Sequence, residues 1–181
     1  MSTKIAESMR ERILTLENDI SLGGWDQSHS FYVIEEVDED PYLIKAAEFD
    51  IHPCDFLDSA PQLNPKIAKG VVLVNECWMT EVPQEVSDIL REKMNELGIP
   101  DSERPQVADL AMRAFYSLIP PSMNPNRIEC RWVQCLLNDG TPIAMYRKRG
   151  DNPQFVDEGI LDGRVLDSMK RLFGIESERA N

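Results

Sequence analysis

Apolar residues recur at steps of three and four along residues 5–20, which is the spacing of one face of an α-helix. Ser2 or Thr3 can cap this helix, and Gly23-Gly24 ends it. The expected buried stripe consists of Ile5, Met9, Ile13, Leu16 and Ile20.

The same spacing predicts three later helices, each ended by a glycine or a proline pair. Pro83 suits the first turn of one of them, and Gly98 supplies its left-handed C-cap. Asp162 can cap the last, which ends at Gly174. These helices span residues 83–97, 105–118 and 162–173.

Segments rich in β-branched and aromatic residues predict four strands. The segment Gly70–Trp78 has an uninterrupted Val-Val-Leu-Val run, so we expect it to be buried on both faces at the centre of the sheet. The other three predicted strands are Phe31–Val37, Arg127–Leu137 and Pro142–Lys148.

The dipeptide Asp139-Gly140 separates the last two strands and favours a tight β-hairpin turn. A two-residue turn would place Leu136 opposite Ile143, whereas a bulged turn would shift this register. The same two-residue register pairs Gln134 with Met145 and Trp132 with Arg147.

Together these elements predict the α+β class, with a single mixed or mostly antiparallel sheet covered by helices and a C-terminal β-hairpin followed by a helix. The 181 residues and 42% apolar content suit one domain over 1–181, with 1–2 and 175–181 frayed. No apolar run approaches the roughly 18 residues of a membrane helix, and the N-terminal segment lacks a signal-peptide core. We therefore expect a cytoplasmic protein without membrane contact. The four cysteines have no CxxC spacing and are expected to be free thiols, mostly buried.

The formal net charge is −13, which disfavours direct binding to nucleic acid. Nine carboxylates lie within residues 35–58, where Lys45 is the single cation. This stretch is interpreted as a solvated loop, with a docking patch for a basic partner as the alternative.

The turn Gly23-Gly24-Trp25-Asp26-Gln27 carries an aromatic ring, a carboxylate and an amide between a helix and a strand. Trp25 can close the end of the core while Asp26 bonds local amides, or the turn can contact a ligand or partner. Glu76 and Trp78, near the end of the Val-rich strand, can serve a site there or can cap the core and face water.

Other chemistry has weaker support. The segment Asp50-Ile-His52-Pro-Cys54-Asp55, with His29 elsewhere in the chain, has metal-compatible atoms, but we expect no metal, because a strand end followed by a proline turn explains these residues. Cys54 or Cys77 paired with His29 could be a nucleophile, but lone cysteines are more often core residues. Glycine-rich phosphate loops are missing, so no cofactor is expected and no catalytic residue is assigned. The basic run Arg147-Lys148-Arg149 is interpreted as a charged strand edge.

The order of GGWDQ, the NECW strand end and the LLNDGTPIAMYRKRG hairpin resembles that in a family of uncharacterised actinobacterial proteins. The resemblance covers nearly the whole chain, although Ser28-His29-Ser30 stands where that family has prolines. It implies an actinobacterial or phage source and a single α+β domain, and no reaction.

The leading hypothesis from the sequence is a non-enzymatic binding or regulatory protein whose acidic surface, with Trp25 near it, engages a basic protein partner. The alternative is a small-molecule-binding pocket protein or an unrecognised hydrolase. Its cleft would require the turn and the strand end to meet and would be lined by Trp25, Asp26, Gln27, Glu76 and Trp78. A DNA-mimicking inhibitor is a third hypothesis. Oligomeric state is left open.

Overall fold

The computed structural model of the chain describes residues 2–38, 40–80, 84–100, 103–104, 107–108, 110–111, 127–156 and 164–176. The chain divides into two compact units, residues 1–77 with 130–181, and residues 78–129. Each unit is described by itself.

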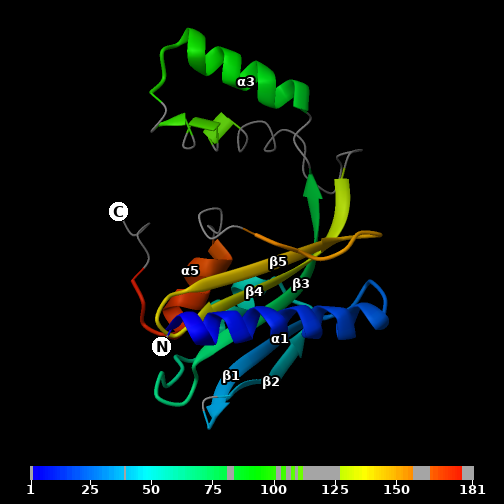
Figure 1. Cartoon of the computed structure of the whole chain (residues 1–181), viewed down its shortest axis with the longest axis vertical. Coiled ribbons are helices and arrows are strands. Elements are labelled where there is room, and N and C mark those ends of the chain that lie inside the picture. Colours follow the sequence, from blue (N-terminus) through cyan, green and yellow to red (C-terminus); the bar gives the residue numbers. More distant parts are fainter. Residues whose placement is uncertain are drawn as a thin grey trace. The chain divides into compact units, whose positions relative to one another are not determined.

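The fold is α+β, and its described strands form one antiparallel sheet in the order β2-β1-β3-β4-β5-β6 (Figure 1). A C-terminal hairpin, β4 with β5, precedes the last helix, which confirms the predicted class and ending. The strands are β1 (His29–Val37), β2 (Asp40–Phe49), β3 (Gly70–Thr80), β4 (Arg127–Leu137), β5 (Pro142–Lys148) and β6 (Gln154–Phe155). The helices are α1 (Ser2–Leu22), α2 (Pro53–Ser59), α3 (Gln84–Glu96) and α5 (Arg164–Leu172).

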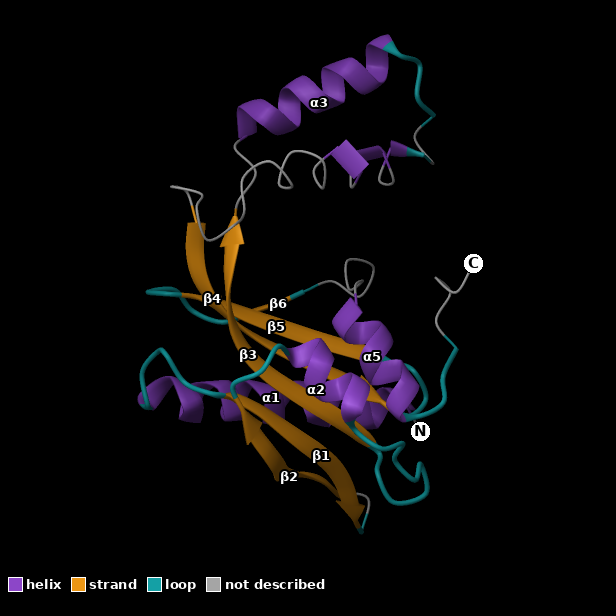
Figure 2. Cartoon of the chain, turned by 180° about the vertical axis from the view of Figure 1, so that it is seen from behind, coloured by secondary structure: helices purple, strands orange, loops and turns teal. Residues whose placement is uncertain are grey.

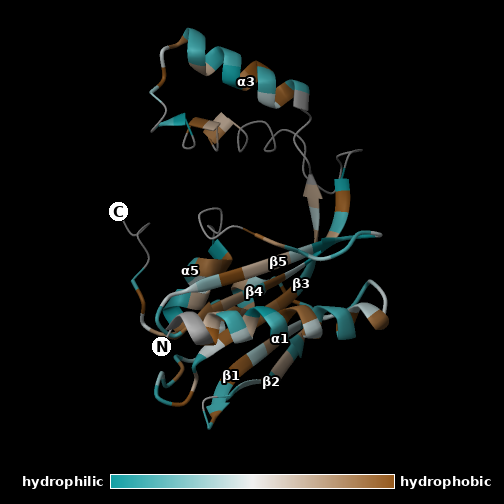
Figure 3. Cartoon of the chain, in the orientation of Figure 1, coloured by the Kyte–Doolittle hydropathy of each residue, from teal (hydrophilic) through white to brown (hydrophobic). Residues whose placement is uncertain are grey.

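One face of the sheet is covered by α1 (Figure 1). Met9 and Ile13 of the predicted stripe are fully buried there, and polar and apolar positions alternate along the helix (Figure 3). They pack on a cluster formed by Tyr32, Ile34, Val72, Val74, Val133, Cys135, Leu137, Ile143 and Met145.

The opposite face of the sheet carries α2 and α5 (Figure 2). Met169 and Leu172 of α5 and Leu57 of α2 are buried against alternate residues of the strands. Those strand residues are Phe31, Val71, Leu73 and Leu136. Two helical layers therefore enclose the sheet and give it a core on each face.

The prediction for β3 is confirmed, because it lies between β1 and β4 and its residues Val71–Val74 are at most 4% exposed. A glycine is needed at position 70, at the start of β3, because a Cβ there would lie 2.7 Å from the carbonyl oxygen of Leu136. A side chain at this position would force the two central strands apart.

The β4–β5 hairpin has the bulged turn and not the two-residue one. Cys135 lies opposite Ile143 and Arg131 opposite Arg147, one residue away from the register of a two-residue turn. The amide of Gly140 donates to the carbonyl of Leu137, and Gly140 has φ +90°. A three-residue loop closed by a glycine in the left-handed region is the next most common hairpin connection after the two-residue loops.

Residues 35–58 are not one solvated loop, as the sequence had suggested. The segment forms β2, which pairs with β1 from Val37 opposite Asp40 to His29 opposite Phe49, and then α2. Asp38 takes φ +51° at the β1–β2 turn, which Asp tolerates better than most residues. The strand continues past the acidic residues because its backbone pairs along the whole of β1.

In the second unit, α3 confirms the helix predicted after Pro83, and Gly98 beyond it has φ +64°. Pro83, most of the helix predicted over 105–118, Asp162 and the chain ends 1 and 177–181 lie outside the described residues. None of the helices in the described part of the chain is long and apolar enough to cross a membrane.

Candidate functional site

The turn after α1 is fixed by its own polar groups. The side-chain amide of Gln27 donates to the carbonyl oxygens of Ile20, at 3.0 Å, and Gly24, at 2.9 Å. Gly24 and Asp26 both have positive φ, +87° and +67°. The chain can therefore reverse tightly from the helix into β1.

The same turn is bonded to Glu76 of β3. Carboxylate oxygen Oε2 of Glu76 accepts from the backbone amides of Asp26, at 2.7 Å, and Gln27, at 3.3 Å. The structure thus brings together four of the residues singled out from the sequence, as the pocket hypothesis required. The fifth, Trp78, belongs to the other unit, where the Arg127 guanidinium lies 4.4 Å from its ring centroid.

Arg131 of β4 lies against this turn and is 1% exposed. Its Nε and Nη2 donate to Oε1 of Glu76 at 3.1 and 2.6 Å, and Nη2 also donates to the carbonyl of Gly24 at 2.5 Å. The guanidinium stands 4.9 Å from the centroid of the Trp25 ring, within the range of a cation–π contact. Trp25 therefore packs over the buried charge of Arg131.

Glu17 of α1 completes the arrangement and is fully buried. Its Oε1 lies 3.5 Å from Nη1 of Arg131, and its Oε2 lies 2.5 Å from Nη2 of Arg147. Arg147 also donates to the side-chain oxygen of Asn18, at 2.7 Å. We call the four residues Glu17, Glu76, Arg131 and Arg147 the buried ion network; two carboxylates and two guanidiniums alternate in it, so its formal charge is zero.

The geometry of the buried ion network indicates a structural role. Both oxygens of Glu76 already accept two hydrogen bonds each. Buried charges are tolerated when they are paired and bonded in this way. Arg147 is therefore not part of a solvated strand edge, which corrects the interpretation of the basic run: β6 pairs beside it, and its side chain is 16% exposed.

Sequence reasoning missed Glu17 and Arg131, although a signal for both was present. Every member of the network continues the buried face of its own element by one more period. Glu17 follows Ile13 by four residues on a helix, Glu76 follows Val74 by two on a strand, Arg131 precedes Val133 by two, and Arg147 follows Met145 by two. Four charged residues whose spacing places them on the buried faces of separate elements are expected to pair with one another.

Two cavities flank the edge strand β2. The first, which we call the α1 groove, has a volume of about 530 Å³ and lies between α1 and β2. It is lined by Ser8, Glu11, Arg12, Thr15, Leu16, Asp19, Tyr42 and Leu43. The second, the loop groove, has about 300 Å³ and is lined by Val33, Glu35, Ile44, Ala46, Leu63, Asn64, Ile67 and Ala68.

Most of the described carboxylates of residues 35–58 lie on β1, β2 or α2, and several bind a partner within the fold. Glu35 accepts from the Tyr42 hydroxyl at 2.9 Å, which raises the pKa of that hydroxyl. Pairs between a carboxylate and a cation join Asp40 to Arg12 at 2.5 Å, Glu48 to Lys45 at 2.8 Å and Glu36 to Lys69 at 3.5 Å. Glu39 lies outside the described residues.

Asp58 at the end of α2 holds α5 in place. The Ser168 hydroxyl donates to it at 2.7 Å, and both Arg171 and Arg164 reach it with guanidinium nitrogens. The hydrogen bond from Ser168, helped by the two cations, lowers the pKa of the Asp58 carboxyl. The Asp58 carboxylate therefore links α2 to α5 within the fold.

The segment around His52 begins helix α2, where the sequence had suggested a strand end followed by a proline turn. Nδ1 of His52 accepts from the backbone amide of Cys54 at 3.2 Å, so His52 is the N-cap and Pro53 the first residue of α2. His29 lies on β1 in a T-shaped contact with Phe49, with 5.5 Å between the ring centroids, and burial lowers its pKa. All four cysteines are free, and Sγ of Cys77 lies 3.5 Å from Sγ of Cys130.

No protein-family model, curated protein or solved structure matches this chain. The resemblance to uncharacterised actinobacterial proteins accordingly rests on the three motifs alone.

Proposed function

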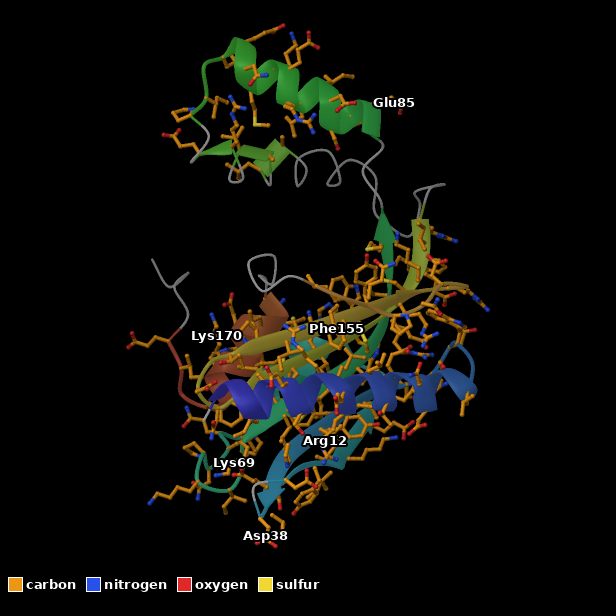
Figure 4. The ribbon with its side chains drawn as sticks, in the orientation of Figure 1. Arg12, Asp38, Lys69, Glu85, Phe155 and Lys170 are labelled. Atoms are coloured by element: carbon orange, nitrogen blue, oxygen red, sulfur yellow. The ribbon has the colours of Figure 1, made fainter. Side chains whose placement is uncertain are left out.

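We propose that the protein is a non-enzymatic binding protein that engages a basic protein partner through the acidic surface around β2. One observation carries the proposal: exposed carboxylates gather at this edge of the sheet. Asp38 and Asp50 flank the strand, and the side chains of Asp40 and Glu48 on it are 72% and 57% exposed. Figure 4 labels Asp38 beyond the tip of β1 and Arg12 on α1.

The α1 groove adds to the same surface. Glu11 and Asp19 line it and are exposed, so six carboxylates stand around β2 and this groove. The cations among the lining residues and β2 are Arg12 and Lys45, which each pair with one of the six. The excess negative charge attracts a cationic surface and speeds its association.

The proposal is tested with a dye-labelled heptalysine peptide and fluorescence anisotropy between about 20 and 300 mM salt. Binding is expected to weaken steeply with salt, because exposed charges are screened over about 8 Å at physiological ionic strength. A variant in which Asp38, Asp40, Glu48 and Asp50 become amides should bind at least about tenfold more weakly, which corresponds to about 1.4 kcal/mol.

The matched control changes four carboxylates of α3 to amides: Glu85, Asp88, Glu92 and Glu96. It alters the net charge by the same amount, and two of its carboxylates are also paired with cations, as on β2. Equal weakening in both variants would mean that only the net charge matters, and the proposed surface would be wrong. Binding that ignores salt would equally reject it.

A further inference from the structure

Among the described strands, β2 is the long strand at an edge of the sheet, and its outer edge pairs with none of the others. β2 has ten residues and lies at the end of the strand order, whereas β6 at the other end has two. An edge strand presents backbone amides and carbonyls that can pair with an added strand. Its middle residues Ile44, Lys45 and Ala46 are exposed.

The two grooves lie on opposite sides of this strand and differ in chemistry. The α1 groove belongs to the face covered by α1 and contains the carboxylates of Glu11 and Asp19. The loop groove belongs to the other face, where Val33 and Leu63 pack toward the core beneath α2 and α5. It is mainly apolar, and its Ile67 is 59% exposed and its Ile44 38%.

We propose that β2 binds an extended segment of a protein partner in which apolar and basic residues alternate. Successive side chains of a strand point to opposite faces of the sheet. A strand added beside β2 would therefore direct every second side chain toward the loop groove and the others toward the α1 groove. Apolar side chains fit the first and lysine or arginine the second, so this inference rests on the proposed function and specifies the partner's sequence pattern.

Charge complementarity selects this occupant over a second copy of the chain. Two copies of β2 paired edge to edge would bring Asp40 and Glu48 of each copy to one interface, together with the flanking Asp38 and Asp50. Like charges across a strand pair are destabilising. A basic segment removes this repulsion and places cations near the carboxylates of the α1 groove.

The experiment compares three dye-labelled, end-capped peptides: Lys-Val-Lys-Val-Lys-Val-Lys, the block sequence Lys-Lys-Lys-Lys-Val-Val-Val, and the alternating peptide with Glu in place of Lys. The first two have the same composition and charge. We expect the alternating basic peptide to bind at least about tenfold more tightly than the block peptide, because burial of one valine side chain has about that effect. The glutamate peptide should not bind.

Two pairs of variants locate the peptide. Ile67→Asn should abolish the preference for the alternating peptide, while Ile89→Asn on α3, at 58% exposure against 59%, should leave it unchanged. The double change Glu11→Gln and Asp19→Asn should weaken binding of the alternating peptide. The control for it is Glu85→Gln with Asp88→Asn, which removes the same charge from α3 and should not weaken binding of the alternating peptide.

The outcomes separate this inference from the proposed function. Salt-sensitive and equal binding of the alternating and block peptides would overturn the strand-addition inference and leave the acidic surface standing. Failure of both basic peptides to bind would overturn both proposals. A preference that survives Ile67→Asn, or a dimer held through β2 in sedimentation, would also overturn the inference.

Discussion

At Asp58 a single carboxylate joins two helices, and its titration can be followed in the stability of the protein. Asp58→Asn should lower the free energy of unfolding by about 1 kcal/mol at pH 7, because the bonds from Ser168 and the two arginines lose a charged acceptor. The pKa of Asp58 is lowered in the folded state. Its contribution is therefore present above the unfolded pKa of about 3.9 and is lost as the pH falls through the folded pKa.

Urea unfolding of wild type and variant between pH 7 and pH 2.5 checks this prediction. The two stabilities should converge at the acid end. Asp55→Asn, one helical turn away on a 65% exposed side chain, is the control and should change stability by less than about 0.5 kcal/mol. A gap between wild type and Asp58→Asn that stays constant with pH would contradict the assignment.

The cysteine thiols give a second prediction at this scale. Burial raises the pKa of Cys135 and of Cys54, and the neighbouring thiol of Cys130 together with burial raises that of Cys77. Because the thiolate is the reactive form, alkylation by iodoacetamide at pH 8 should be at least about tenfold slower in the folded protein than in guanidinium chloride. Mass spectrometry of the alkylated protein measures this, and rapid labelling of Cys135 would contradict its burial.

Helix α1 carries a fully buried carboxylate, that of Glu17. Glu17→Ala would leave Arg147 and Arg131 with one carboxylate between them. Removal of one partner from a buried ion pair is expected to lower the free energy of unfolding by about 3–5 kcal/mol. Asp19→Ala, two residues along the helix and exposed, should change it by less than about 0.5 kcal/mol.

Chemical denaturation of the two variants gives the comparison. A loss below about 1 kcal/mol for Glu17→Ala would mean that water reaches the two guanidiniums and that the network is not buried in solution. Circular dichroism of Glu17→Ala under native conditions distinguishes a destabilised fold from an unfolded one, so that the free energy is interpreted only for a folded variant.

The elements that the sequence predicted are those whose burial follows a simple period. Helix α1 has apolar residues at helical spacing and strand β3 has an uninterrupted apolar run, and both lie where expected. Strand β2 was missed because its pattern has no alternation: Pro41 is its one buried residue, and Ile44 to Ala46 are exposed. Its strand conformation depends on pairing with β1, which is a tertiary interaction. Seven-residue α2 is likewise too short for a periodic signal.

The candidate site was predicted only in its outline. The sequence singled out the GWDQ turn and Glu76, which the structure joins by two hydrogen bonds. It could not identify Arg131 as their partner, because contact between β4 and the turn depends on the order of the strands. The grooves beside β2 were beyond prediction for the same reason, since the edge of a sheet is known only when its topology is known.

For the molecule as a whole, the division into two units has a consequence for stability. Among the described residues, all members of both core clusters belong to the first unit. Replacement of residues 78–129 by a short Asn-Gly turn should therefore leave a protein that unfolds cooperatively, with a Tm within about 5 °C of the full chain, a shift equivalent to about 1 kcal/mol. The connection is short, because β3 and β4 are neighbours and Sγ of Cys77 lies 3.5 Å from Sγ of Cys130.

The shortened protein also tests where the binding surface lies. The described residues that line the two grooves all belong to the first unit, as does β2. Its affinity for the alternating basic peptide should consequently equal that of the full chain within about twofold, a difference of about 0.4 kcal/mol. Calorimetric unfolding tests whether the shortened protein folds, and fluorescence anisotropy on the same preparation tests whether it binds the alternating basic peptide. A shortened protein that folds but no longer binds would place part of the binding surface in residues 78–129, whereas one that fails to fold would show that the first unit depends on the second for its core.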